Sequence, residues 1–471
     1  PLRGIISYGV HIPYNRLART AIGEALGSGG GRGTRTVASY DEDTTTMAVE
    51  AARLARRARA DVAIDDVWFA TSSPAYLDKT NACAVHAALR LDPSTGAADM
   101  GGAVRSGLAA LAAGLGGAGT TLVAASDIRT GLPGSADERE GGDGAAAFVV
   151  GETDGPVLAE LIGRSAATEE FLDRWRLPGE PRSQQWEERF GEGKYAALAK
   201  QAWASALEAT SITPEQLDRA VVTGSHTRAV RSVGRKLGLA EGVLVDDLSA
   251  SVGNTGAAHA GILLASALDT AEPGQIIAVV VLSDGADVLV FRTTDAIADW
   301  QPQRPVAAQV AAGSDALPYT KFLSWREMLT VEPPRRPVPD RPSAAAAGRS
   351  EDWKYGFVGG KDRSSGRVHL PPQRKSEKGS ALDDMDPAPM ADVPATVVTS
   401  TVDRVSYSPS PPIVAAVIDF DGGGRMPVEL TDVAADEIAI GDRVEMTFRR
   451  LYTTFGIHNY FWKARPIRVE G

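Results

Sequence analysis

Two short polar segments hold residues that could do chemistry. Thr223–Arg228 contains His226, an imidazole that can accept or donate a proton. Gly253–Gly256 contains Asn254, whose amide can donate a hydrogen bond to a developing oxyanion. The only thiol, Cys83, could act as a nucleophile. Its surroundings are typical of a helix, however, so we expect a small, buried and inert cysteine.

Composition excludes several classes of protein. The chain has 471 residues, 43% of them hydrophobic and 23% charged, which is typical of a soluble protein of two or three domains. A formal charge of -11, without a local basic patch, argues against a nucleic-acid partner. A single cysteine excludes a disulfide framework and any multi-cysteine metal site. The glycine clusters at 29–31 and 114–119 lack the residues of a phosphate-binding loop, so we interpret them as ordinary loops.

Nothing in the sequence predicts a membrane segment. The longest apolar runs, such as Ile276–Leu282, have seven residues, whereas a spanning helix needs roughly 18 or more. The first residues, Pro1–Ile5, do not resemble a secretory signal. We therefore expect a cytoplasmic protein with no membrane partner.

The elements that must position the polar segments change character along the chain. Up to about residue 300, strand-like apolar runs alternate with longer helical patterns, which is typical of a layered α/β architecture. Residues 299–392 are rich in proline and polar residues, and we interpret much of this segment as a linker. From about residue 395, short alternating strands such as Ile413–Phe420 predict a small β-barrel or sandwich. The turn residues Asp421–Gly424 then predict a hairpin.

The first 300 residues contain an internal repeat. Val85–Leu91 recurs as Val233–Leu239, 148 residues later. Each half also has Asp-Gly-Ala before an apolar strand, starting at Asp143 and at Asp284. Chance similarity among Ala- and Gly-rich helices is the alternative, but the order of the matches favours two copies of one α/β unit.

The repeat and its motifs resemble the thiolase superfamily, above all 3-hydroxy-3-methylglutaryl-CoA synthases and type III ketoacyl synthases. The resemblance implies a duplicated five-layer αβαβα sandwich with halves at 1–155 and 156–298. Tyr319–Arg326 and Gly366–Pro372 in turn resemble acyl-CoA-associated OB-fold proteins, which implies an OB-fold β-barrel at 393–471. The fold class expected is thus α/β, with a C-terminal barrel.

The sequence departs from this superfamily where chemistry is expected. The resemblance places the catalytic cysteine, which carries the acyl group, at Val104, and valine cannot be acylated. The catalytic glutamate position is Ser72, and the catalytic histidine position is Thr223. Of the usual polar set, only Asn254 remains. We therefore predict that Asn254, with Ser72, Thr223 or a shifted base, forms what is left of the site.

Other residues near these positions are candidates too. His226, three residues after Thr223, is the candidate shifted base, although an ordinary loop histidine is the alternative. Tyr76 could act as a phenolic acid or could pack at an interface. Val104, Arg105 and Ser106 are predicted to border the substrate. Arginine can bind a carboxylate or phosphate, but an internal salt bridge, for example to Asp99, is the alternative. His259 we interpret as a packing residue.

The second domain shows a parallel loss. The OB-fold relatives usually carry a zinc ribbon, which needs four ligands at paired spacing. The first pair of ligand positions reads Asp362 and Ser365, and no cysteine follows Pro371–Pro372. Asp362 and His369 cannot hold structural zinc alone, so we predict no metal and expect either an ordered remnant or a disordered segment.

Two functions of different class remain open. In the first, the chain is an enzyme that acts on an acyl-CoA or carrier-bound acyl group without a cysteine nucleophile, by aldol-type C–C bond chemistry or direct acyl transfer. In the second, it is a catalytically silent scaffold or acyl-CoA-binding subunit that partners an active thiolase-like enzyme. Neither needs a cofactor besides acyl-CoA as substrate. The resemblance implies a homodimer, and acyl-CoA or an acyl-carrier protein is the expected partner.

Overall fold

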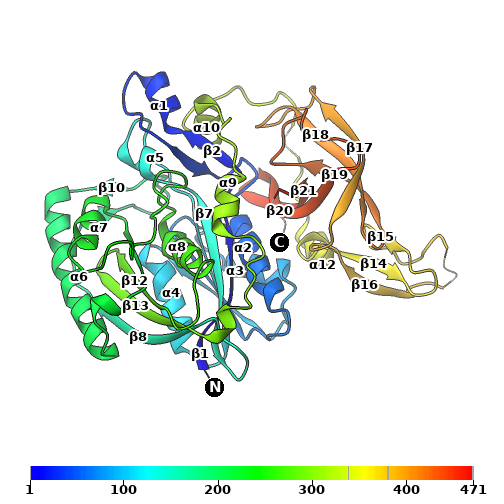
Figure 1. The fold of residues 1–471 in the computed structure, drawn as a ribbon. Coiled ribbons are helices and arrows are strands. Elements are labelled where there is room, and N and C mark those ends of the chain that lie inside the picture. Colours follow the sequence, from blue (N-terminus) through cyan, green and yellow to red (C-terminus); the bar gives the residue numbers. More distant parts are fainter. Residues whose placement is uncertain (1, 338, 379–380, 469–471) are drawn as a thin grey trace.

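A computed structural model describes residues 2–337, 339–378 and 381–468. Its α/β part contains a nine-stranded sheet. Figure 1 shows this part beside a smaller C-terminal part coloured yellow to red. The strands, in their order across the sheet, are β11 (Arg219–Gly224), β12 (Ile276–Leu282), β13 (Ala286–Thr293), β8 (Ala159–Ala167), β1 (Leu2–His11), β7 (Gly144–Thr153), β6 (Thr120–Asp127), β4 (Asp66–Thr71) and β5 (Gly96–Gly101).

The strand order contains the predicted duplication. The first unit runs β5-β4-β6-β7-β1, and the second repeats this order as β11-β12-β13-β8. The equivalent of β5 is reduced in the second unit to a parallel bridge between Ala220 and Leu244. The units join where β1 pairs with β8 through Gly4 and Ile5. The repeated Asp-Gly-Ala motifs precede β7 and β13, the equivalent antiparallel strands of the two units.

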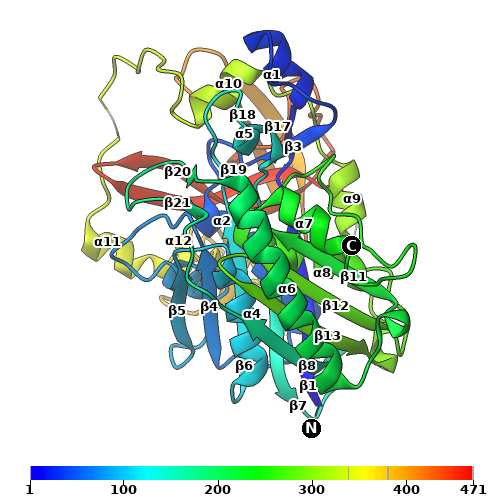
Figure 2. The same cartoon turned by 90° about the vertical axis from the view of Figure 1, so that its left-hand side faces the viewer.

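Helices form three layers around the two units, as the five-layer prediction requires. One apolar cluster lies beneath the outer helices of the first unit, a second surrounds the helices between the units, and a third lies beneath the outer helices of the second unit. Figure 2 shows α6 and α7 on the outer face of the second unit. The helices of the three layers are α2 (Thr44–Ala58) and α3 (Ala82–Ala88), then α4 (Arg105–Gly116) and α8 (His259–Leu268), then α6 (Glu188–Thr210) and α7 (Thr227–Gly234).

The sequence of the middle layer explains its position. Helix α8 is apolar on nearly all sides, and eight of its residues are buried. A helix that is hydrophobic all round is stable only when other elements cover every face. At the start of α4, a Cβ on Gly107 would lie 2.0 Å from the carbonyl oxygen of Ala257. Glycine therefore lets α4 touch the backbone of the turn that precedes α8.

The segment predicted as a linker is partly folded onto the α/β part. Helices α9 (Val306–Ala311) and α10 (Tyr319–Trp325) lie within it. Phe322 of α10 is fully buried in a cluster with Leu17, Ile22 and Val37 of the N-terminal region. The sequence did not predict this packing. The segment is rich in proline, and the apolar residues of α10 span only two helical turns, which is too short to give a clear helical pattern. The smaller elements nearby are β2 (Asn15–Ala18), α1 (Arg19–Leu26), β3 (Thr34–Val37), α5 (Ala136–Glu140), β9 (Arg174–Trp175), β10 (Gln184–Gln185), α11 (Ala344–Arg349) and α12 (Glu351–Lys354).

The C-terminal part is a closed barrel preceded by a small sheet. Barrel strands β17 and β20 pair to close the ring. The predicted hairpin at Asp421–Gly424 is confirmed as the turn between β18 and β19. Among the described residues, no helix has both the length and the apolar character needed to span a membrane. The strands are β14 (Val358–Asp362), β15 (Val368–His369) and β16 (Met385–Pro389) in the small sheet, and β17 (Ala395–Asp403), β18 (Ile413–Phe420), β19 (Arg425–Leu430), β20 (Arg443–Thr454) and β21 (Ile457–Pro466) in the barrel.

A buried ion network joins the barrel to the α/β part. Arg449 of β20 is fully buried, and its guanidinium lies 3.1 Å from a carboxylate oxygen of Asp41 and 3.2 Å from one of Glu42. It also pairs at 2.6 Å with Asp432, which belongs to the barrel. One arginine thus binds an acid of the barrel and two acids of the segment that leads into α2.

Two further barrel cations extend the network. Lys463 pairs with Asp41 at 3.0 Å, and Arg465 pairs with Glu50 of α2, also at 3.0 Å. Burial alone would raise the pKa of Asp41, but Lys463 and Arg449 outweigh it and hold that pKa below its ordinary value. Asp41 is therefore ionised at neutral pH, and the docked barrel supplies its counter-charges.

We expect Arg449→Met to destabilise the protein strongly. The substitution leaves three buried carboxylates without their shared cation, and breaking a buried pair in this way costs about 3–5 kcal/mol. The control is Arg425→Met, on a barrel arginine whose pair with Asp419 is largely exposed and is worth less than about 1 kcal/mol. Chemical denaturation of both variants measures the difference. Equal losses would contradict the assigned role of the network.

Candidate functional site

Val104 directly precedes α4, at the end of the loop after β5. Arg105, the first residue of α4, pairs with Asp287 at 2.7 and 3.2 Å and donates to the carbonyl oxygen of Asp284 at 2.8 Å. The internal salt bridge considered for Arg105 therefore exists, but with Asp287 rather than Asp99. The guanidinium joins the start of α4 to the second Asp-Gly-Ala motif.

Ser106 and Asp99 are also occupied by local contacts. The Ser106 hydroxyl donates to the carbonyl oxygen of Gly101 at 3.1 Å. The carboxylate of Asp99 accepts hydrogen bonds from the backbone of Asn81 and Ala82, which start α3. Both groups thus fix the elements around Val104.

Ser72 is held by a fully buried carboxylate, Asp127, at the end of β6. The backbone amide of Ser72 donates to Asp127 at 2.7 Å, and its hydroxyl donates at 2.9 Å. The same carboxylate accepts from the amide of Ala257 at 2.8 Å, in the turn before α8. The hydrogen bonds of Asp127 therefore connect the end of β4 in the first unit to the second unit, and Ser72 takes part in them.

His226 caps helix α7. Its Nδ1 accepts from the backbone amide of Ala229 at 3.1 Å, and its Nε2 donates to the carbonyl oxygen of Glu188 at 2.8 Å. Both ring nitrogens of this buried imidazole are thus bonded to backbone. In this arrangement His226 has no nitrogen available to move a substrate proton.

Tyr76 lies against the barrel. Its hydroxyl accepts from the backbone amide of His458, at the start of β21, at 2.8 Å, and the two rings lie 4.9 Å apart. Tyr76 therefore packs between the two domains of this chain, whereas its packing at an interface between subunits stays a prediction. Cys83, on α3, is exposed, so the expectation that it is buried was wrong.

Asn254 and Thr223 do meet at one cavity of about 180 Å³. The Asn254 side chain donates to the carbonyl oxygen of Gly224 at 2.7 Å and accepts from the amide of Gly256 at 2.9 Å. An amide nitrogen carries two hydrogens, so one donor remains. The cavity is lined by Arg19, Gly31, Arg32, Arg139, Glu140, Val222, Thr223, Gly224, Thr227, Val230, Arg231, Asp247, Ser249, Asn254 and His259.

Cations dominate the cavity wall. It contains four arginines and only two carboxylates, those of Glu140 and Asp247. Glu140 accepts from the hydroxyl of Thr227 at 2.8 Å. Burial lowers the pKa of Arg19, which is the effect expected of a cation that is partly desolvated. The wall is therefore suited to an anionic ligand.

His259 also lines this cavity. It is buried at the start of α8, and its Nδ1 lies 3.3 Å from the hydroxyl oxygen of Thr255. Burial lowers its pKa to about 4, although Asp247 favours the charged form. The imidazole is therefore neutral at neutral pH. A base this weak takes up a proton poorly near pH 7.

Sequence reasoning missed several residues of this site. The arginines come from three separated segments, so no local basic run reveals the cationic wall. Asp127 ends a strand of small apolar residues and carries no motif of its own. Glu140 sits next to the repeated Asp-Gly-Ala motif, which was a usable signal. Among the described residues, no cluster of three or more histidine, cysteine or acidic side chains could hold a metal ion.

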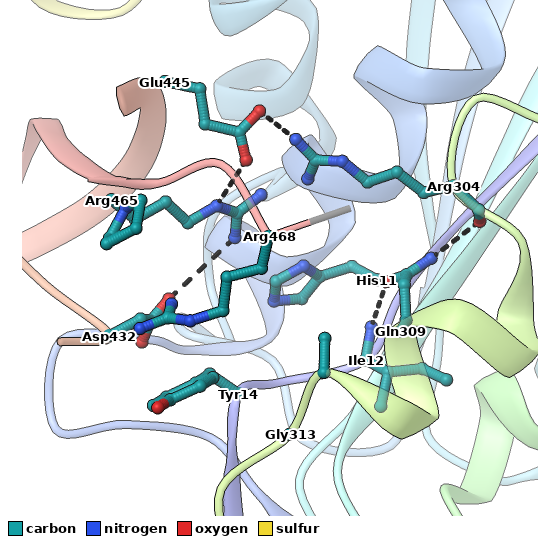
Figure 3. Close-up of a pocket in the computed structure, with 12 residues that line it drawn as sticks. His11, Ile12, Tyr14, Arg304, Gln309, Gly313, Asp432, Glu445, Arg465 and Arg468 are labelled. Atoms are coloured by element: carbon teal, nitrogen blue, oxygen red, sulfur yellow. Dashed lines mark hydrogen bonds and ion pairs between the residues drawn. The ribbon is translucent and has the colours of Figure 1, made fainter. Parts of the chain in front are cut away.

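A second cavity, of about 60 Å³, lies between the two domains (Figure 3). His11 and Gln309 of the α/β part face Arg465 and Asp432 of the barrel across it. Its charged groups are mostly engaged with one another. Glu445, for example, binds both Arg304 and Arg465. We therefore assign this cavity to the domain interface.

Comparison with known proteins gives the family. The chain is 30% identical over 347 residues to the hydroxymethylglutaryl-CoA synthase of Methanopyrus kandleri. The aligned region covers 69% of this chain and 97% of that protein. The chain belongs to the hydroxymethylglutaryl-CoA synthase family. Residues 207–289 also match the C-terminal profile of 3-oxoacyl-[acyl-carrier-protein] synthase III. Residues 389–449 match the C-terminal OB-fold domain of ChsH2.

Solved structures agree with this family fold. A structure described as HMG-CoA synthase complexed with CoA superposes with a TM-score of 0.56 at 20% identity, covering 67% of this chain and 88% of that one. The 3-oxoacyl-(acyl carrier protein) synthase III of Pseudomonas aeruginosa superposes with a TM-score of 0.55, also at 20% identity, covering 62% and 99%. The predicted thiolase-like sandwich and OB-fold barrel are confirmed.

We expect His259 to make this family member less stable as the pH falls. Its pKa of about 4 lies below the ordinary value near 6.5, so between these values the unfolded chain binds more protons and unfolding becomes easier. By pH 5 the loss from this group reaches about 2 kcal/mol. His259→Gln should lose less stability between pH 7.5 and pH 5 than the parent, as measured by urea denaturation. An identical loss in both proteins would contradict the assignment.

Proposed function

We propose that the chain binds an acyl thioester, carried by CoA or an acyl-carrier protein, beside Asn254 without forming a covalent acyl-enzyme at residue 104. The coarser assignment, to an acyl-CoA condensing family of the thiolase superfamily, rests on the comparisons. The observation that carries the finer proposal is the state of the other site positions. Residue 104 is a valine, and both nitrogens of His226 are bonded to backbone.

The valine at residue 104 and the backbone-bonded imidazole of His226 favour binding over turnover. An acyl-enzyme needs a thiolate or hydroxylate with a base beside it. The hydroxyl of Ser72 already donates to Asp127, and Cys83 lies on α3, the helix before β5. The proposed role is therefore that of a silent, acyl-thioester-binding member of an assembly.

The cavity retains what binding requires. The second N–H of Asn254 can donate to a thioester carbonyl, and the arginines complement the charge of a CoA or carrier phosphate. A solved relative is described as complexed with CoA. We assign the arginine wall to the anionic end of the ligand and Asn254 to its carbonyl end.

The proposed assembly partner is a second copy of this chain or another thiolase-like protein. Strand β5 forms one edge of the nine-stranded sheet. Its outward edge offers the backbone groups to which another strand can add.

A second candidate function is catalysis without a covalent intermediate. Glu140 lines the same cavity as Asn254, so a carboxylate and an amide donor are both present. A base and a fixed donor suffice for enolate formation in an aldol-type step. Here Glu140 takes the proton-moving role predicted for His226, Ser72 or Tyr76.

The first test is labelling. The isolated chain is incubated with radiolabelled acetyl-CoA, and binding is followed by calorimetry. The proposal expects saturable binding, no acid-stable label on the denatured protein and no turnover. Label attached to the chain would contradict it, whereas turnover that Glu140→Gln abolishes would favour the second candidate.

The second test asks whether the arginines of the cavity wall contribute to acetyl-CoA binding. We expect Arg231→Gln to weaken acetyl-CoA binding about 3- to 10-fold, because it removes one charge that faces the ligand phosphates, and the loss should shrink at high salt. The control is Arg235→Gln, a substitution of the same type about one turn further along the chain and outside the cavity lining. Equal effects of the two variants would remove the cavity from the binding proposal.

A further inference from the structure

The small sheet β14–β15–β16 occupies the place where OB-fold relatives carry a zinc ribbon, so its side chains can be tested against a metal centre. A structural zinc ion takes four nitrogen or sulfur ligands in a tetrahedron. The first pair of ligand positions reads Asp362 and Ser365, and Ser376 lies in the loop after Pro371–Pro372, where no cysteine follows. The nearest imidazole is His369. Among the described residues these side chains do not form a group that could hold a metal.

The same side chains bond to one another. Asp362, at the end of β14, accepts hydrogen bonds from the Ser364 hydroxyl and the Ser365 amide, both at 2.8 Å, and from the Ser365 hydroxyl. His369, at the end of β15, pairs through Nε2 with the hydroxyl of Ser376 at 3.0 Å. Asp362 and Ser376 are 1% and 2% exposed, so one member of each pair is buried, whereas Ser365 is exposed.

The bonds close the two turns that a zinc ribbon closes through its ligand pairs. Asp362–Ser365 spans the turn from β14 to β15, where Gly366 adopts a positive φ of 71°. His369–Ser376 ties β15 to the loop that follows it. One pair thus lies before β15 and the other ties the end of β15 to the next loop.

Packing anchors this sheet to the barrel. Phe357, directly before β14, is fully buried, and its ring lies 5.8 Å from that of Trp462 and 5.9 Å from that of Phe420. Outside the cluster, Arg374 binds Asp383 at 2.8 and 2.6 Å. The sheet is thus held at its base by aromatic contacts and at its turns by polar contacts.

We infer that a hydrogen-bonded cluster of Asp362, Ser365, His369 and Ser376 replaces a metal centre in this chain, so that the small sheet folds without a metal ion. This inference is independent of the acyl-thioester site. Of the two predictions for this segment, the structure agrees with an ordered remnant, since β14, β15 and β16 are formed.

The first experiment uses the full-length chain. Zinc content is measured by plasma mass spectrometry, and amide hydrogen exchange of residues 358–389 is measured with and without a chelator. The inference expects less than one zinc ion in ten chains and unchanged exchange. A full equivalent of zinc, whose removal speeds exchange in these strands, would overturn it.

The second experiment reverses the replacement. Asp362→Cys, Ser365→Cys and Ser376→Cys are combined in one chain that keeps His369, which supplies three thiolates and one imidazole. We expect this variant to bind one zinc ion per chain and to become chelator-sensitive, whereas the same variant with His369→Ala binds zinc at least tenfold more weakly. A folded triple variant that binds no zinc would show that these residues do not share one centre.

A single substitution keeps the inference testable if the triple variant does not fold. Asp362→Ala should speed amide exchange within β14 and β15 at least tenfold, because three hydrogen bonds lose their acceptor. The matched control is Asp384→Ala, on a more exposed carboxylate of the same sheet region. Unchanged exchange in Asp362→Ala would contradict the role of the cluster.

Discussion

The docking of the barrel on the α/β part depends on a buried ion network centred on Arg449, beside an apolar cluster that both parts share. Arg449 places its guanidinium between carboxylates of both domains, with no exposed surface. Ions are costly to desolvate, so these groups stay buried only while every partner is present. The geometry of the domain interface is therefore strongly specified, since a small shift would leave an unpaired charge in an apolar surrounding. Tyr76 and the loop after β4 are held in place by the same docking.

Much of the fold could be predicted because local sequence patterns, such as repeated motifs, apolar runs and turn residues, specify its elements. The Asp-Gly-Ala motifs and the repeat at Val85 and Val233 identify equivalent parts of two units, and the structure arranges the units in matching order. The run Ile276–Leu282 forms a strand buried almost along its length, as its apolar sequence indicates. The turn at Asp421–Gly424 follows from glycine's freedom to adopt positive φ.

The site was harder to predict because the availability of each side chain depends on contacts between segments that are distant in the sequence. Asn254 and Thr223 line one cavity, but nothing local to His226 reveals that Glu188 engages its second nitrogen. The partner of Arg105 is 182 residues away and could not be chosen by proximity in sequence. Cys83 was misjudged because the exposure of a helical residue depends on what packs against the helix. Spacing identifies candidate groups, but their hydrogen-bond partners determine whether they are free to react.

The bond between Ser72 and Asp127 has a consequence for any attempt to restore an acid at residue 72. A carboxylate placed there would face a second carboxylate that is fully buried and already accepts hydrogen bonds from both units. The two like charges would repel, and Arg129, 3.9 Å from Asp127 and 3.3 Å from the Ser72 hydroxyl, would have to serve both. A carboxylate at residue 72 would therefore compete with Asp127 for the same donors and strain the contact that joins the two units. An acid at this position requires compensating changes around Asp127.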